Sequence, residues 1–127
     1  MDILKIDGKS LNLKDFISVT RGYRQVELSK EAVEAVIKAR EVVDRYVEEK
    51  RVVYGITTGF GKFCDTVIDT NETSLLQKNL IISHACGVGE PLAEDIVRGI
   101  ILLRVNALSK GFSGIRLETL NGLIEML

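Results

Sequence analysis

The sequence has little of several residue types on which common kinds of protein site depend. It contains one histidine, two cysteines, one proline and no tryptophan. A single histidine excludes a metal site built from several imidazoles within this chain, and we expect no metal. Cys64 and Cys86 lack the CxxC spacing of a zinc or redox motif. Their small number and wide separation favour free thiols in a reducing compartment.

Neither sign of charge is in excess. The 17 lysines and arginines are balanced by 18 aspartates and glutamates, which leaves a formal charge of −1. A protein that grips a phosphate backbone needs a surplus of basic side chains, so we expect no nucleic-acid partner.

Long hydrophobic runs are also missing. The most apolar segment, residues 96–108, is interrupted by Arg98 and Arg104. It falls short of the ~20 apolar residues that a membrane-spanning helix needs. The first residues carry no apolar stretch of the secretory kind. We therefore expect a cytoplasmic protein without a membrane partner, folded as a single domain over residues 1–127.

Most of the chain has helical periodicity. Apolar residues recur every three or four positions after Ser29, which predicts a helix over about residues 30–49. Asn12 is placed to cap a shorter helix that ends at Gly22. Two further helices are predicted, one from about residue 70 closed by Gly87 in a left-handed conformation, and one from Glu90 and Pro91 to about Lys110. The chain is predicted to be mainly α.

Short strands are predicted at two places, residues 3–6 and residues 51–56. The last segment, residues 115–127, begins an amphipathic helix that stops on an apolar residue without a stop signal. We therefore expect the chain to be truncated, with apolar faces meant for further segments.

The stretch YGITTGFGK, residues 54–62, holds three glycines. It is not a P-loop, because five residues separate Gly55 from Gly61 and Phe63 follows the lysine. The GxGxxG order of a dinucleotide site is absent as well. Two interpretations remain open: a tight turn with glycines at positive φ, or a mobile active-site loop, which the density of glycine favours.

Three motifs in order carry a family resemblance: YGITTGFGK, then LQKNLIISHACGVGEPL, then RVNALSKGFSGIR. Together they resemble the amino-terminal part of the aromatic amino acid ammonia-lyases, and the histidine-specific members are the most similar. The resemblance covers nearly the whole chain. It implies the all-helical, fumarase/aspartase-like fold of that family and a homotetramer with active sites shared between subunits.

The resemblance also implies a cofactor, 4-methylidene-imidazol-5-one, which the family makes autocatalytically from an Ala-Ser-Gly tripeptide. No Ala-Ser-Gly occurs in this chain. The nearest match, Phe112-Ser113-Gly114, lies in a predicted turn between helices. In the family the tripeptide lies beyond the point where this chain ends, so we expect the chain alone to be inactive.

The site residues follow from the same match. Tyr54 matches the tyrosine that removes a β-proton from the substrate, and His84 matches the residue that contacts the substrate ring. As an isolated pattern, His84 is more readily an ordinary helix histidine, and the resemblance favours the role at the substrate ring instead. The resemblance implies an active-site loop formed by Gly55, Thr58, Gly59, Phe60 and Gly61.

The resemblance leaves the substrate open. Elimination of ammonia from L-histidine to give urocanate, a step of histidine catabolism, is the first expectation. However, Thr57 stands where histidine-specific relatives typically have asparagine, and a threonine pair resembles phenylalanine and tyrosine lyases. The alternatives are a tyrosine or phenylalanine ammonia-lyase, an aminomutase, and a non-catalytic helical interaction module derived from the lyase scaffold.

Overall fold

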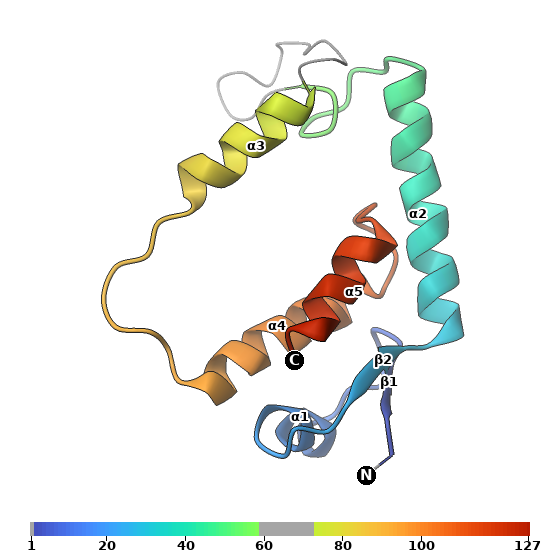
Figure 1. Cartoon of the computed structure of the whole chain (residues 1–127). Coiled ribbons are helices and arrows are strands. Elements are labelled where there is room, and N and C mark those ends of the chain that lie inside the picture. Colours follow the sequence, from blue (N-terminus) through green and yellow to red (C-terminus); the bar gives the residue numbers. More distant parts are fainter. Residues whose placement is uncertain (1, 59–72) are drawn as a thin grey trace. The chain divides into compact units, whose positions relative to one another are not determined.

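Helices make up most of the protein, as expected for a mainly α chain. The computed structural model describes residues 2–58 and 73–127 (Figure 1). In chain order the elements are β1 (Leu4–Ile6), α1 (Leu13–Thr20), β2 (Val26–Leu28), α2 (Lys30–Glu48), α3 (Thr73–His84), α4 (Glu94–Leu108) and α5 (Leu117–Glu125). The helix predicted for residues 30–49 is therefore confirmed almost to the residue.

The chain forms two compact units. The first unit combines Met1–Glu41 with Pro91–Leu127, and the second unit is Val42–Glu90. Helix α2 begins in the first unit and ends in the second. The expectation of one domain over residues 1–127 stays a prediction.

A small apolar core holds the first unit together. Its fully buried members come from four helices and one strand: Ile6, Val19, Val36, Leu102, Val105 and Leu120. Full burial of one such side chain contributes about 1.5–3 kcal/mol. Helix α4 packs against both α1 and α5 (Figure 1), so the two ends of the sequence share one core.

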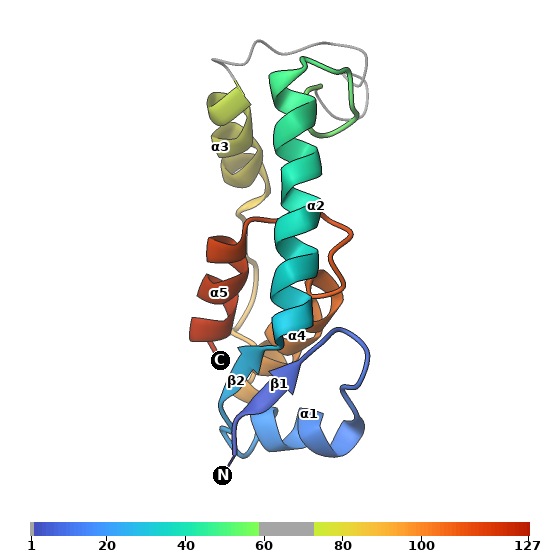
Figure 2. The same ribbon diagram turned by 90° about the vertical axis from the view of Figure 1, so that its right-hand side faces the viewer.

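The strands β1 and β2 run parallel, in the register Leu4↔Val26 to Ile6↔Leu28 (Figure 2). The sequence predicted β1 but not β2. Gly8 follows β1 with a φ of +80°, as a turn glycine should. The carboxylate of Asp7 accepts hydrogen bonds from the backbone N–H groups of Lys9 and Ser10, at 2.7 and 2.8 Å.

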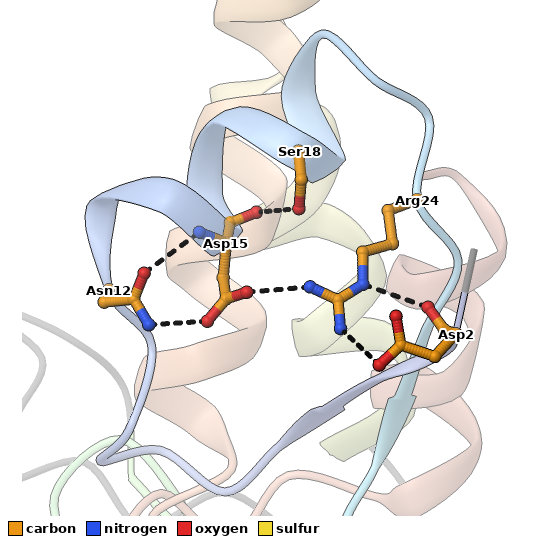
Figure 3. A network of polar contacts seen from close by, with 5 residues as sticks. All are labelled: Asp2, Asn12, Asp15, Ser18 and Arg24. Atoms are coloured by element: carbon orange, nitrogen blue, oxygen red, sulfur yellow. Dashed lines mark hydrogen bonds and ion pairs between the residues drawn. The ribbon is translucent and has the colours of Figure 1, made fainter.

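The start of α1 is fixed by a polar network (Figure 3). Asn12 caps the helix as predicted, because its Oδ1 accepts from the backbone N–H of Asp15 at 3.0 Å. The Asp15 carboxylate also accepts from Nη1 of Arg24 at 2.7 Å. Arg24 reaches Asp2 as well, through Nε to the backbone carbonyl and Nη2 to the carboxylate. One guanidinium thus ties α1 to the beginning of the chain.

A second arginine joins α4 to α1 and to Leu127, the last residue of the chain. The side chain of Arg98 is buried, and its Nε and Nη2 donate to the backbone carbonyl of Val19 at 3.3 and 2.9 Å. Its Nη1 donates to the carbonyl of Leu127. The guanidinium also stacks on the ring of Tyr23, 4.4 Å from the centroid. Arg98 was read from the sequence only as an interruption of an apolar segment.

Two details of the predicted helix ends are wrong. Gly87 does not close α3 in a left-handed conformation; the glycine with positive φ in that stretch is Gly89, at +88°. Helix α4 begins at Glu94 rather than at Pro91. Gly111 does follow α4 with a φ of +73°.

Within the described residues, no helix combines the length and the apolar character needed to span a membrane. Cys86 is a free, exposed thiol, and Cys64 lies outside the described part of the chain.

Candidate active site

Residues 51–53 have no regular structure and residues 54–57 form a tight turn, so the strand predicted for residues 51–56 is wrong. The backbone N–H groups of Ile56 and Thr57 both donate to the carbonyl of Val53, at 3.1 and 3.0 Å. The Thr57 hydroxyl accepts from the N–H of Val53 at 2.9 Å and donates to the carbonyl of Arg51. Side-chain hydrogen bonds of this kind compete with a strand ladder, which explains why a β-branched run did not form one.

Tyr54 lies within this turn, and its side chain is 63% exposed. The next residue, Gly55, has a φ of +72°, in the region that glycine adopts without steric cost. The turn therefore places the phenol of Tyr54 at the surface of the second unit. The backbone conformation of the next residue is one that glycine adopts more readily than other residues. This geometry agrees with the tight-turn interpretation, and it leaves the catalytic role of Tyr54 a prediction.

Thr58 directly follows the turn and is buried against it. It is 1% exposed, and its Oγ1 accepts from the N–H of Gly55 at 3.4 Å. The other predicted loop residues, Gly59, Phe60 and Gly61, lie outside the described residues. Sequence reasoning placed Thr58 in the active-site loop, and the structure gives it a place in the packing of the turn.

His84 is the last residue of α3 and is exposed. Its Nδ1 lies 2.9 Å from the backbone carbonyl oxygen of Leu80 and 3.0 Å from Oγ of Ser83. Oγ of Ser83 in turn lies 2.8 Å from the same carbonyl oxygen. Both contacts found for the ring within the described part of the chain are at Nδ1.

The structure places the predicted base and the predicted ring-binding residue in the same unit. Tyr54 comes from the turn after α2, and His84 comes from the end of α3. Thr57 and Ser83, which organise the surroundings of these two residues, were not among the predicted site residues. Both carry a hydroxyl group close in sequence to a predicted site residue, Thr57 three residues after Tyr54 and Ser83 one residue before His84. A hydroxyl at such a spacing can bond to the local backbone, and this is the signal that could have identified them.

Among residues 2–58 and 73–127, no group of three or more histidine, cysteine, aspartate or glutamate side chains is arranged to hold a metal ion.

The arrangement of these elements is that of the ammonia-lyase fold. The histidine ammonia-lyase of Trypanosoma cruzi superposes with a TM-score of 0.89 at 40% identity, covering 98% of this chain and 24% of that chain. The ergothioneine-degrading enzyme ergothionase of Treponema denticola superposes with a TM-score of 0.92 at 36% identity, covering 98% of this chain and 25% of that chain. The helices of this chain thus follow a known lyase framework.

Residues 11–127 match the aromatic amino acid lyase family, and the chain belongs to this family. A histidine ammonia-lyase of Alkaliphilus oremlandii is 67% identical over 127 residues, which is 100% of this chain and 25% of the relative. The chain therefore spans about a quarter of the length of the curated relatives that it matches. The resemblance identified from the three motifs is confirmed.

Members of this family in general depend on the methylidene-imidazolone group. The 127 residues contain no Ala-Ser-Gly. Phe112 and Ser113, in the nearest match, are exposed residues of the turn between α4 and α5. The residues present therefore do not fit the precursor of this group.

Proposed function

We propose that this chain is the amino-terminal part of a histidine ammonia-lyase, the enzyme that converts L-histidine to urocanate and ammonia. The observation that carries the proposal is the 67% identity with a histidine ammonia-lyase over every residue of the chain. The order of the three motifs and the placement of Tyr54 and His84 in one unit support it.

Within this proposal Tyr54 takes the β-proton of the substrate. Its side chain is exposed and is followed by Gly55 at positive φ, so the phenol can move with a loop that closes over the substrate. Closure of such a loop excludes water from the reacting atoms. The electrophile is supplied by residues outside this chain.

His84 orients the substrate ring. Its Nδ1 is engaged by α3 itself, and its Nε2 is the nitrogen available to a polar group on the ring. We further propose that the complete enzyme is cytoplasmic and assembles as a homotetramer, as the family resemblance implies.

A chimera tests this function. Replacing the matching quarter of the Alkaliphilus oremlandii histidine ammonia-lyase with this chain joins the proposed base to a complete lyase. We expect the chimera to release urocanate from L-histidine, which is followed by its ultraviolet absorbance. The isolated chain should show no turnover under the same conditions.

The Tyr54→Phe variant of the chimera serves as the matched control, because it removes only the phenolic hydroxyl. We expect kcat to fall by at least about 100-fold, the scale of a lost general base, while the circular dichroism spectrum stays the same. Near-normal turnover by Tyr54→Phe would remove Tyr54 from the mechanism. An inactive but folded chimera would count against the function itself.

Two features favour testing other substrates. The Thr57-Thr58 pair resembles that of phenylalanine and tyrosine lyases, and a tyrosine aminomutase of Streptomyces globisporus superposes with a TM-score of 0.90 at 32% identity. Ergothionase superposes equally well. The chimera is therefore assayed with L-tyrosine, L-phenylalanine and ergothioneine beside L-histidine, and the highest kcat/KM identifies the substrate. If none reacts, a stable complex of the chain with another protein would favour the interaction-module alternative.

A further inference from the structure

The ring of His84 is held by two oxygen atoms of its own helix. Nδ1 lies 2.9 Å from the carbonyl oxygen of Leu80. A carbonyl oxygen can only accept a hydrogen bond, so Nδ1 must carry the hydrogen. If Nδ1 were unprotonated, two lone pairs would face each other at hydrogen-bond distance. The tautomer therefore follows from the identity of the partner.

Ser83 completes the arrangement. Its hydroxyl lies 2.8 Å from the Leu80 carbonyl oxygen and 3.0 Å from Nδ1 of His84. The hydroxyl hydrogen points to the carbonyl, because that oxygen cannot donate. The lone pairs of Oγ then face Nδ1, and the Nδ1–H group is shared between two acceptors. Only a protonated Nδ1 satisfies all three distances at once.

We propose that Ser83 is a positioning residue that holds neutral His84 in the Nδ1–H tautomer, so that Nε2 offers a lone pair to a hydrogen-bond donor on the substrate ring. This inference rests on the proposed function and specifies its selectivity. An imidazole N–H or a phenol O–H can donate to Nε2. An unsubstituted phenyl ring cannot, so the site selects aromatic substrates that carry a ring donor.

The tautomer can be measured directly, because His84 is the only histidine of the chain. In the ¹⁵N-labelled 127-residue chain at about pH 8.5, where an ordinary imidazole is neutral, long-range ¹H–¹⁵N correlation spectra distinguish a protonated from an unprotonated ring nitrogen. We expect a protonated Nδ1 and an unprotonated Nε2. Free histidine side chains in water favour the opposite tautomer, so a predominant Nε2–H form in the chain would overturn the proposal.

Two variants separate Ser83 from the Leu80 carbonyl. Ser83→Ala removes the second acceptor, and we expect the Nδ1–H population to fall and the two ¹⁵N shifts to move toward each other. Ser83→Thr keeps the hydroxyl and should restore the wild-type shifts. Equal helix content by circular dichroism controls for folding. If Ser83→Ala keeps the wild-type shifts, the carbonyl alone holds the tautomer and Ser83 has no positioning role.

In the chimera, Ser83→Ala should raise the KM for L-histidine about five-fold, the scale of one weakened hydrogen bond, with little change in kcat. Ser83→Thr should keep the KM of the parent. A chimera that is inactive with every substrate counts against the proposed function, while the spectra still decide the tautomer. If the chimera is active but the spectra of the 127-residue chain show a protonated Nε2, the role of Ser83 is refuted and the proposed function is retained.

Discussion

At the scale of single residues, Arg24 shows how much one side chain can organise. Its side chain is 15% exposed, and its guanidinium donates to the carboxylates of Asp15 and Asp2 (Figure 3). Arg24→Ala should lower the free energy of unfolding by about 1–2 kcal/mol, because a partly buried charge-assisted pair is lost and the start of α1 is freed. Urea unfolding followed by circular dichroism measures the change.

Asp2→Asn is the matched control for Arg24→Ala. The Asp2 side chain is 87% exposed, and an exposed ion pair contributes about 0–1 kcal/mol. We expect this variant to lie close to the wild type. If both variants lose the same stability, the contact with Asp15 is not the important one.

The carboxyl group of Asp7 should make the stability of the folded chain depend on pH. Hydrogen bonds from the backbone N–H groups of Ser10 and Lys9 lower the pKa of Asp7 below its ordinary value of 3.8. Because the folded-state pKa lies below the unfolded one, this contribution to stability is fully present above about pH 3.8. It is lost as the pH falls through the folded-state pKa.

The Asp7→Asn variant keeps an oxygen acceptor for the turn but does not titrate. Below about pH 4, its stability should therefore fall less steeply than that of the wild type. Urea unfolding at a series of pH values between about 5 and 2 gives the comparison. Parallel curves for the two proteins would show that Asp7 titrates equally in the folded and unfolded chains.

At the scale of elements, two glycines should respond in opposite ways to substitution by alanine. Gly111 follows the end of α4, and Gly122 lies within α5. Gly111 has a φ of +73°, and an added Cβ would lie 2.7 Å from backbone atoms of Ala35. Gly111→Ala should therefore destabilise the first unit by at least about 1–3 kcal/mol, through backbone strain and a clash with α2. Thermal unfolding reports the loss.

Gly122 lies within α5, and an added Cβ would meet no neighbouring atom of the described residues within 4 Å. Gly122→Ala should stabilise the chain by about 0.5–1 kcal/mol, because alanine has the higher helix propensity. The same substitution is thus expected to act in opposite directions at the two sites. A gain in stability from Gly111→Ala would contradict the close approach to α2.

The elements that sequence patterns predicted well are those with local causes. Helix α2 has an apolar periodicity and Ser29 at its start, and Ser29 Oγ accepts from the N–H of Ala32 at 3.1 Å. Strand β2 was missed because it has three residues and owes its conformation to β1, far back in the sequence. The tertiary partner, and not the local pattern, decides such a strand.

The same distinction holds for the site. Tyr54 and His84 were proposed from motifs, because a motif is a local pattern, and their roles stay predictions. The turn around Tyr54 was read as a strand, since Val52 and Val53 favour β structure and nothing in the pattern revealed that Thr57 would occupy the N–H of Val53. Hydrogen-bond partners of this kind depend on how the backbone folds back on itself.

At the scale of the whole molecule, the two units should differ in local stability. Helix α4 contributes Leu102 and Val105, both fully buried, to the core of the first unit. In the second unit, Ile81 and Ile82 of α3 are 68% and 63% exposed. Apolar residues that remain exposed give α3 little tertiary stabilisation from residues 2–58 and 73–127.

Hydrogen exchange tests this difference. Backbone amides of α3 should exchange on the order of 100-fold or more faster than those around Leu102 and Val105 in the same sample. Two-dimensional NMR in D₂O measures both sets at once. Equal protection of α3 and α4 would show that α3 is held as firmly as the core helices.

The first unit is assembled from both ends of the sequence, with the second unit as an insertion between Glu41 and Pro91. Closing an interval of about 50 residues costs roughly 3–4 kcal/mol of chain entropy. During synthesis, Val19 and Val36 are complete long before Leu102 and Leu120 emerge. At about 5–20 residues per second, these apolar side chains wait several seconds on the ribosome for their partners. During this interval the nascent chain exposes apolar side chains that chaperones can bind. The risk of aggregation is therefore greatest before the core has formed.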